Sequence, residues 1–197
     1  MESEIRHTIA ESLSSFRLPR YDDIPNVGLY LEQTVNYLME YLSLILDSAV
    51  TTSMVSNYVK KKLVKNPVRK QYNREQIAVL FFIAITKSVL SLENIRVLLT
   101  IREDHFDSAA AYNLFCEELE MVLMSTCGLD KVPESVSGLS YLGSSEFMSD
   151  PFAGQPLNRS DGEFSGTEER EILHNVVVMA ANKIYLDKWI SLFAGKK

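Results

Sequence analysis

Positive charge is concentrated in one short stretch of an otherwise acidic chain. The 197-residue sequence has 20 Lys and Arg against 26 Asp and Glu, a net charge of −6. Between Asp47 and Glu75 there is no acidic residue, and without the seven cations of this window the chain would carry −13. Cations clustered on one small element are the electrostatic signature of a nucleic-acid contact. The seven cations are Lys60, Lys61, Lys62, Lys65, Arg69, Lys70 and Arg74.

Hydroxyl and amide side chains share this window with the cations. A helix over 52–63 would bury Val55, Tyr58, Val59 and Leu63 and turn its polar residues to the opposite face. Hydroxyls, an amide and ammonium groups can contact base edges and phosphates in the major groove of DNA. The predicted groove contacts are Thr52, Ser53, Ser56, Asn57, Lys60 and Lys61. The predicted phosphate contacts are Lys65, Arg69, Lys70 and Arg74.

The basic window has three interpretations. The first is the solvated basic face of a helical bundle. The second is the docking surface of a helical protein-interaction module, and the third is a DNA-binding surface. Charge alone favours the solvated face, whereas charge, the missing acids and the order of the predicted elements together favour DNA. An enzyme whose site is scattered along the chain is a weaker fourth alternative.

The sequence lacks the motifs of common enzymes and metal sites. His7, His105 and His174 are isolated, without a second ligand at the spacing of an HExxH helix. There is no GxGxxG, Walker or GxSxG motif. The spacing of Cys116 and Cys127 fits neither a CxxC pair nor a disulfide framework. We therefore expect both cysteines to be small buried side chains. We therefore predict a protein that is not an enzyme and uses neither a metal nor a cofactor.

Hydrophobic periodicity and capping signals predict a mainly α-helical protein. The helix before the basic window is expected to start near Pro25, and Asn73 with Gln76 forms a capping pair for a later helix. Short strands on both sides of a tight turn at Asn66-Pro67 are predicted to form a small two-stranded wing. The predicted helices span 26–47, 52–63, 74–87, 91–99, 107–126 and 167–193.

Pattern and charge divide the chain into two predicted domains. Residues 1–102 hold the helix over 26–47 and the DNA-binding unit, and residues 103–197 form an acidic helical domain. Within the second domain, residues 128–166 hold six of the eight glycines and three of the six prolines, which predicts a long loop. No apolar run reaches the roughly 18 residues of a transmembrane helix, and no secretory signal is recognisable. We therefore expect a cytoplasmic protein.

The predicted order of elements is that of a winged helix-turn-helix, and the residues resemble the DNA-binding domain of MerR-type regulators. The resembling segments are VTTSMVSNYVKKKLV, RKQYNREQIAVLFFI and VLSLENIRVLL. The resemblance places Tyr58 and Leu63 in the recognition helix, and Lys70 and Tyr72 at the Arg-x-Tyr pair of the wing. Lys62 stands where the pattern has a glycine. The resemblance implies sequence-specific binding to double-stranded DNA.

A second resemblance covers more of the chain, roughly Leu18 to Leu99. The segments LPRYDDIPNVGLYLEQTVNYL and TTSMVSNYVKKKLVKNPVRKQYNREQIAVL are similar to the bacterial family called domain of unknown function 1836. That family is regarded as transcriptional regulators of Gram-positive bacteria and brings no catalytic residues. The resemblance therefore implies a regulator and names no ligand.

A regulator with one recognition helix per chain is expected to act as a homodimer, because paired half-sites raise affinity and specificity. The acidic half is the expected interface, since DNA would repel it. Its last helix offers an apolar stripe that faces either a second copy or the protein's own core. The sequence leaves open whether a small-molecule effector binds. The stripe consists of Leu173, Val176, Val177, Ala180 and Ile184.

Overall fold

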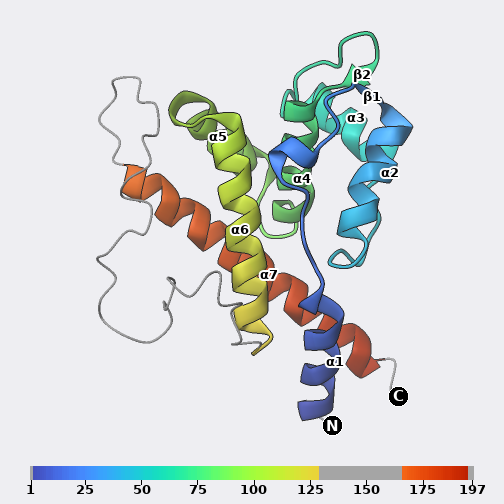
Figure 1. Ribbon diagram of the computed structural model, residues 1–197, viewed down its shortest axis with the longest axis vertical. Helices are drawn as coiled ribbons and strands as arrows, with labels where there is room; N and C mark the ends of the chain where they lie inside the picture. Colours follow the sequence, from blue (N-terminus) through green and yellow to red (C-terminus); the bar gives the residue numbers. More distant parts are fainter. Residues whose placement is uncertain (1, 129–165, 195–197) are drawn as a thin grey trace.

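The computed structural model describes residues 2–128 and 166–194 and consists mainly of α-helices (Figure 1). This confirms the mainly helical part of the predicted fold class. The predicted loop over 128–166 lies almost entirely outside the described residues. No helix of these two segments is long and apolar enough to cross a membrane. In chain order the elements are α1 (Glu2–Ser14), the 3₁₀ turn η1 (Tyr21–Asp23), β1 (Leu29–Tyr30), α2 (Leu31–Leu42), α3 (Thr52–Lys60), β2 (Gln71–Tyr72), α4 (Arg74–Thr86), α5 (Leu92–His105), α6 (Ser108–Thr126) and α7 (Gly166–Ala194).

Three helices, α4, α6 and α7, agree with their predicted ranges to within one residue. α4 starts at the predicted capping pair: the Asn73 side chain accepts the Gln76 N–H at 2.9 Å, and Gln76 Oε1 accepts the Asn73 N–H at 2.9 Å. α6 starts where Asp107 accepts two backbone N–H groups. It ends before Gly128, whose φ of +72° is the left-handed conformation expected of a helix-ending glycine. Local signals therefore define these helices.

The helix predicted over 26–47 is shorter at both ends. Its start near Pro25 is wrong, because β1 occupies the residues before it and α2 begins only after Tyr30. Gly28 lets this segment pass close to β2, where an added Cβ would lie 2.8 Å from Gln71 Cβ. α2 also ends before its predicted C-terminus, and a nine-residue connection, 43–51, leads to α3. Strand pairing thus replaces the first turns of the predicted helix.

The predicted strand pairing of the wing is wrong. β2 does not pair across Asn66-Pro67 but runs antiparallel to β1, with Leu29 opposite Tyr72 and Tyr30 opposite Gln71. The tight turn lies just before β2 instead of at the proline. The result is still a two-stranded sheet, and it joins the segment before α2 to the segment after α3.

Two helical segments go beyond the prediction. α1 was not predicted; it lies beside the C-terminal end of α7 and also contacts α6 (Figure 1), with Ile5, Ile9 and Leu13 buried. α5 was predicted to end at residue 99 but continues to His105, and Phe106 then leads in extended conformation to the cap of α6. Both extensions place additional side chains against the C-terminal helices.

α4 forms the centre of the hydrophobic core. Ten of its 13 residues are buried, and a helix that is apolar on all sides needs neighbours on all sides. α2, α6 and α7 pack against it. The apolar stripe of α7 also faces this core: Leu173 is half-buried, and the other four members are buried. The buried side chains form one cluster across both predicted domains, and the division at residue 102 stays a prediction.

Candidate nucleic-acid interface

α3 presents the predicted polar face to solvent. The helix starts after Thr51, whose hydroxyl accepts the Met54 N–H at 3.2 Å, and it buries Val55 and Tyr58 against the core. The predicted groove residues share the opposite face and are exposed, except Thr52, which is half-buried. Together with Leu31 of α2, most of them line a shallow open depression. These lining residues are Thr52, Ser53, Ser56, Asn57 and Lys60.

The C-terminal end of α3 is closed by a backbone motif and by one arginine. The Leu63 N–H bonds to the Tyr58 carbonyl and the Lys62 N–H to the Val59 carbonyl, both at 2.9 Å, which is a Schellman ending. Lys62 therefore has φ +58°, a conformation that favours glycine. The helix ends at Lys60, earlier than the predicted residue 63, because this motif reverses the chain.

Arg96 links α5 to the same end of α3. Its Nη2 donates to the Lys61 carbonyl oxygen at 2.6 Å, so that it satisfies one of the last carbonyls of the helix. Arg96 was not among the predicted site residues. The sequence carries no signal for this role, since the two residues are 35 positions apart and only the fold brings them together.

The second group of predicted contacts lies at a two-residue hairpin turn. Val68 and Gln71 exchange both backbone hydrogen bonds, at 3.1 and 2.9 Å, around Arg69 and Lys70. Arg69 has φ +51° and Lys70 φ +64°, the values of a turn that normally uses Asn-Gly. Each such residue other than glycine costs about 1 kcal/mol or more. Both side chains are exposed at the tip of the turn.

The structure divides the predicted phosphate contacts into partnered and unpartnered cations. Arg74 donates from Nε to the Ile24 carbonyl at 2.8 Å and from Nη1 to Asp22 at 2.9 Å, and its guanidinium lies over the ring of Tyr21. Its side chain is only 22% exposed, so its role is to hold η1 onto α4. The predicted role of Arg74 as a phosphate contact therefore has no structural support.

The other cations are more accessible. Lys65 Nζ lies 3.3 Å from Glu103 Oε1, and both side chains are exposed. Within the described residues, the remaining cations of the window make no ion pair. These exposed cations are Lys60, Lys61, Lys62, Arg69 and Lys70. They lie on α3, at its C-terminal end and at the hairpin turn, and together they are called the basic surface.

Lys87 lies close to the buried side of α3. Its Nζ is 3.8 Å from Met54 Sδ, and burial lowers the pKa of its ammonium group below the ordinary lysine value. A half-buried lysine of this kind supports α4 and α3 through the packing of its alkyl chain. It is thus distinct from the exposed lysines on the other side of the helix.

The side chains considered for catalysis or metal binding lie apart. In residues 2–128 and 166–194 no three His, Cys, Asp or Glu residues form a group that could hold a metal ion. Cys116 and Cys127 are buried free thiols, as predicted, and burial raises the pKa of Cys116 to about 12. His174 pairs with Glu118 at 3.5 Å; burial raises the pKa of that carboxyl group, and His174 partly offsets the shift. These side chains are thus either buried in the core or paired within the fold.

Comparison with known proteins identifies one family. Residues 19–115 match the family described as domain of unknown function (DUF1836). This match supports the family predicted from the sequence. It covers the segment from η1 through the first part of α6, which includes the whole basic surface. No curated protein and no solved structure matches the chain.

Proposed function

We propose that this DUF1836 chain is a transcriptional regulator that binds double-stranded DNA, with the exposed face of α3 in the major groove. The observation that supports the proposal is the combination of that polar face with five cations that pair with no carboxylate of the described residues. Isolated surface cations in an acidic protein are expected to have an anionic partner outside the chain. DNA phosphate is the partner that best fits an arrangement of one helix and one basic turn.

The arrangement of elements favours a winged helix-turn-helix related to that of MerR-type regulators. α2 and α3 supply the helix pair, and the strand before α2 pairs with the strand after α3. The hairpin turn of Arg69 and Lys70 takes the place of the wing, at the end of the molecule where β1 and β2 meet (Figure 1). The nine-residue connection between α2 and α3 is longer than the three or four residues usual in the motif.

Positive φ values at the turn add a second argument. Strained backbone persists where the surrounding structure enforces it, and such sites cluster at functional surfaces. Here the strain turns two neighbouring cations, Arg69 and Lys70, outward from the same tip. Such a tip suits contact with two nearby phosphates of one strand.

Substitutions at the turn test the phosphate contacts. Arg69→Ala and Lys70→Ala should each weaken binding to specific and random duplex alike, and each should lower the slope of log affinity against log salt by about 1. Fluorescence anisotropy over a range of salt concentrations measures both quantities. Arg6→Ala is the matched control, because Arg6 is an exposed cation on α1, far from the turn (Figure 1).

A substitution on α3 tests the base contacts. Asn can pair with adenine through two hydrogen bonds, so Asn57→Ala should cost roughly 1–3 kcal/mol on the selected site and little on random duplex. The site itself comes from selection in a random duplex pool, and Asn182→Ala on α7 is the control. If these variants bind DNA like the parent protein but lose a protein partner, the basic surface is a protein-docking surface instead.

We also propose that the regulator acts as a homodimer. The stripe first considered for the interface is packed in the protein's own core, so the outward face of α7 is the better candidate. That face carries four exposed apolar side chains at intervals of seven residues, Ile172, Met179, Leu186 and Phe193. Light scattering of Met179→Glu and Leu186→Glu beside the parent protein tests it. A parent protein that is monomeric at tens of micromolar, with and without its selected DNA, would contradict the dimer.

A further inference from the structure

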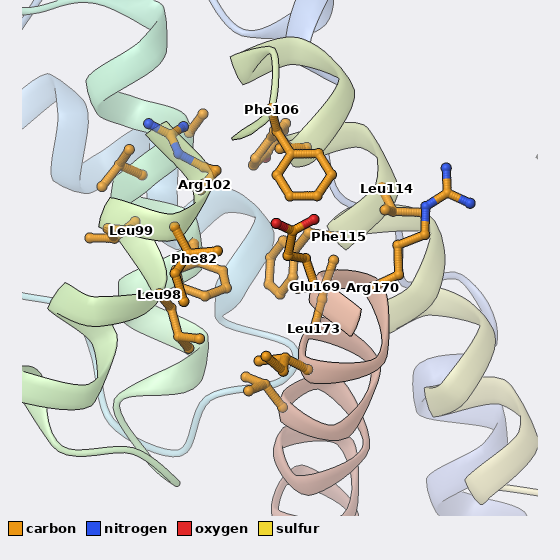
Figure 2. A pocket seen from close by; sticks show the side chains of 17 residues that line it. Phe82, Leu98, Leu99, Arg102, Phe106, Leu114, Phe115, Glu169, Arg170 and Leu173 are labelled. Atoms are coloured by element: carbon orange, nitrogen blue, oxygen red, sulfur yellow. The ribbon is translucent and has the colours of Figure 1, made fainter. Parts of the chain in front are cut away.

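A small apolar cavity lies where α4, α5, α6 and α7 meet, with Phe82, Phe106 and Phe115 around it (Figure 2). Its volume is about 90 Å³, and most of the side chains that line it are aliphatic or aromatic. Glu169 and Arg170 are also lining residues, and both have interactions within the protein. The space is smaller than the cavity of about 150 Å³ that admits benzene. It is therefore a gap in the packing of four helices, whereas the small sheet presents side chains at the surface.

The small sheet has one face toward the core and one toward solvent. Directly opposite residues of antiparallel strands point to the same side, and successive residues of a strand point to opposite sides. Leu29 lies opposite Tyr72; Tyr72 is buried and Leu29 half-buried, so this pair faces the core. Tyr30 lies opposite Gln71, and Gln71 is paired in turn with Val68 across the hairpin turn. These three residues therefore form a row on the outer face.

Tyr30 and Gln71 are direct neighbours in this row. Gln71 exchanges both of its backbone hydrogen bonds with Val68, so its pairing with Tyr30 is of the non-hydrogen-bonded kind, in which side chains lie closer together. The Tyr30 N–H bonds instead to Gln33 Oε1 at 2.9 Å, which fixes Tyr30 at the start of α2. Tyr30 is 53% exposed and Val68 72%. The outer face is thus an accessible, uncharged row that includes one aromatic hydroxyl.

The row connects the two parts of the proposed DNA-binding surface. Leu31, the residue after Tyr30, lines the depression on the polar face of α3. Lys70, the residue before Gln71, lies exposed at the tip of the hairpin turn. Figure 1 shows β1, β2 and α3 at the same end of the molecule. A duplex that contacts both α3 and the turn therefore passes over Tyr30 and Gln71.

We propose that Tyr30 is a further DNA contact, whose hydroxyl donates a hydrogen bond to a backbone phosphate between α3 and the hairpin turn. This inference rests on the proposed DNA binding. Tyrosine hydroxyls are among the groups that bond phosphate oxygens, and such contacts position the protein without reading sequence. Glu32, an exposed acid in the first turn of α2, is two positions further on, and residues two apart in a helix do not face each other.

The contact differs from those of Arg69 and Lys70 in that it is uncharged and displaces no counterion. Tyr30→Phe removes only the hydroxyl group and should weaken binding to the selected site and to random duplex alike, by about three- to tenfold for one neutral hydrogen bond. The slope of log affinity against log salt should stay that of the parent protein. Fluorescence anisotropy measures both quantities. Tyr185→Phe, the same change on a half-buried tyrosine of α7, should bind like the parent protein.

A cation placed at the same position gives the opposite signature. Tyr30→Lys brings an ammonium group to the phosphate and should raise the salt slope by about 1. Thr8→Lys is the matched control, because it adds the same charge at an exposed position of α1, at the other end of the molecule (Figure 1). A salt slope that Tyr30→Lys leaves unchanged would contradict a phosphate beside Tyr30.

A scan of single methylphosphonate substitutions along the selected site separates a direct contact from an indirect effect on the fold. At one phosphate the substitution should weaken the parent protein more than it weakens Tyr30→Phe, because the variant has already lost that hydrogen bond. If no phosphate shows this coupling, or if Tyr30→Phe binds like the parent protein, Tyr30 is not a DNA contact. The DNA-binding proposal still stands in that case if Arg69→Ala lowers the salt slope. A parent protein that binds no duplex overturns both proposals.

Discussion

Two groups of cations in this protein differ in their hydrogen-bond and ion-pair partners. The anchored arginines, Arg20, Arg74 and Arg96, each join segments that are far apart in the chain. The outward cations, Lys60, Lys61, Arg69 and Lys70, make no ion pair with any described residue. Arginine suits the first group, because its planar fork can bond two oxygens at once.

The difference shows why sequence charge alone is a poor guide to a binding surface. Arg74 and Lys70 lie four positions apart in the same acid-free window, but only Arg74 is contacted by Asp22 of η1 and by the carbonyl of Ile24, which follows η1. The segment before α2 thus neutralises one edge of the basic window. The cations that stay exposed without an ion pair lie on α3, at its C-terminal end and at the hairpin turn.

The largest expected loss of stability comes from removing Glu120, the buried carboxylate that holds the anchored Arg20. Glu120 is buried, and its carboxylate accepts two bonds from Arg20, at 3.0 and 2.8 Å, and the Leu18 N–H at 2.9 Å. Glu120→Ala should lower the free energy of unfolding by about 2–3 kcal/mol in urea denaturation, because it leaves a half-buried cation and a buried N–H unpaired. Glu117→Ala, at an exposed position of the same helix, should change it by less than about 0.5 kcal/mol.

A smaller effect is expected at Arg74. Arg74→Ala removes three hydrogen bonds to Asp22 and Ile24 and the contact with Tyr21, and should cost about 1–2 kcal/mol of unfolding free energy. Lys70→Ala should leave stability nearly unchanged and reduce the salt dependence of DNA binding. The comparison between the two groups fails if Arg74→Ala lowers the salt slope as Lys70→Ala does while the protein keeps its full stability.

A gain in stability is expected at the end of α3. Lys62 has φ +58°, so Lys62→Gly should raise the free energy of unfolding by about 1 kcal/mol by removing the strain on a side chain in the left-handed region. Lys61→Gly is the control, since the φ of Lys61 is −81° and glycine offers no relief there. A thermal melt in which Lys62→Gly is no more stable than the parent would contradict the Schellman ending.

The smallest effect concerns pH and the segment held by Arg20. Cys116 lies beneath it, 3.9 Å from the Pro19 carbonyl, and burial raises the pKa of its thiol from 9.0 to about 12. The unfolded thiol ionises first, so its contribution to stability is complete only well below pH 9 and decreases as the pH rises through 9 toward 12. Between pH 7 and 9 the loss should be about 0.4 kcal/mol. In Cys116→Ala, urea denaturation at pH 7 and at pH 9 should not show this loss of unfolding free energy.

Local patterns predicted the helices whose ends are made locally. α4 and α6 begin at capping side chains, α6 also ends before a glycine, and α7 has the acidic first turn expected near a helix N-terminus. Such signals act within a few residues. α1 was missed because its repeat is short and its composition polar, so that its burial against α7 supplies most of its stability. The α2 prediction was wrong at its start because β1 pairs with a strand 41 to 43 positions away in the chain.

The sequence by itself determined the mainly helical class, the similarity of residues 19–115 to the DUF1836 family, the polar face of α3 and the concentration of cations, because periodicity, motifs and charge are properties of short segments. Only the tertiary structure decided which cations of the basic window are neutralised, since Asp22, the ion-pair partner of Arg74, lies 52 residues away in the chain. It also decided which face of α7 is exposed, and it brought α4, α5, α6 and α7 together around a small apolar cavity. Ion pairs and cavities depend on distances in space, which no local pattern records.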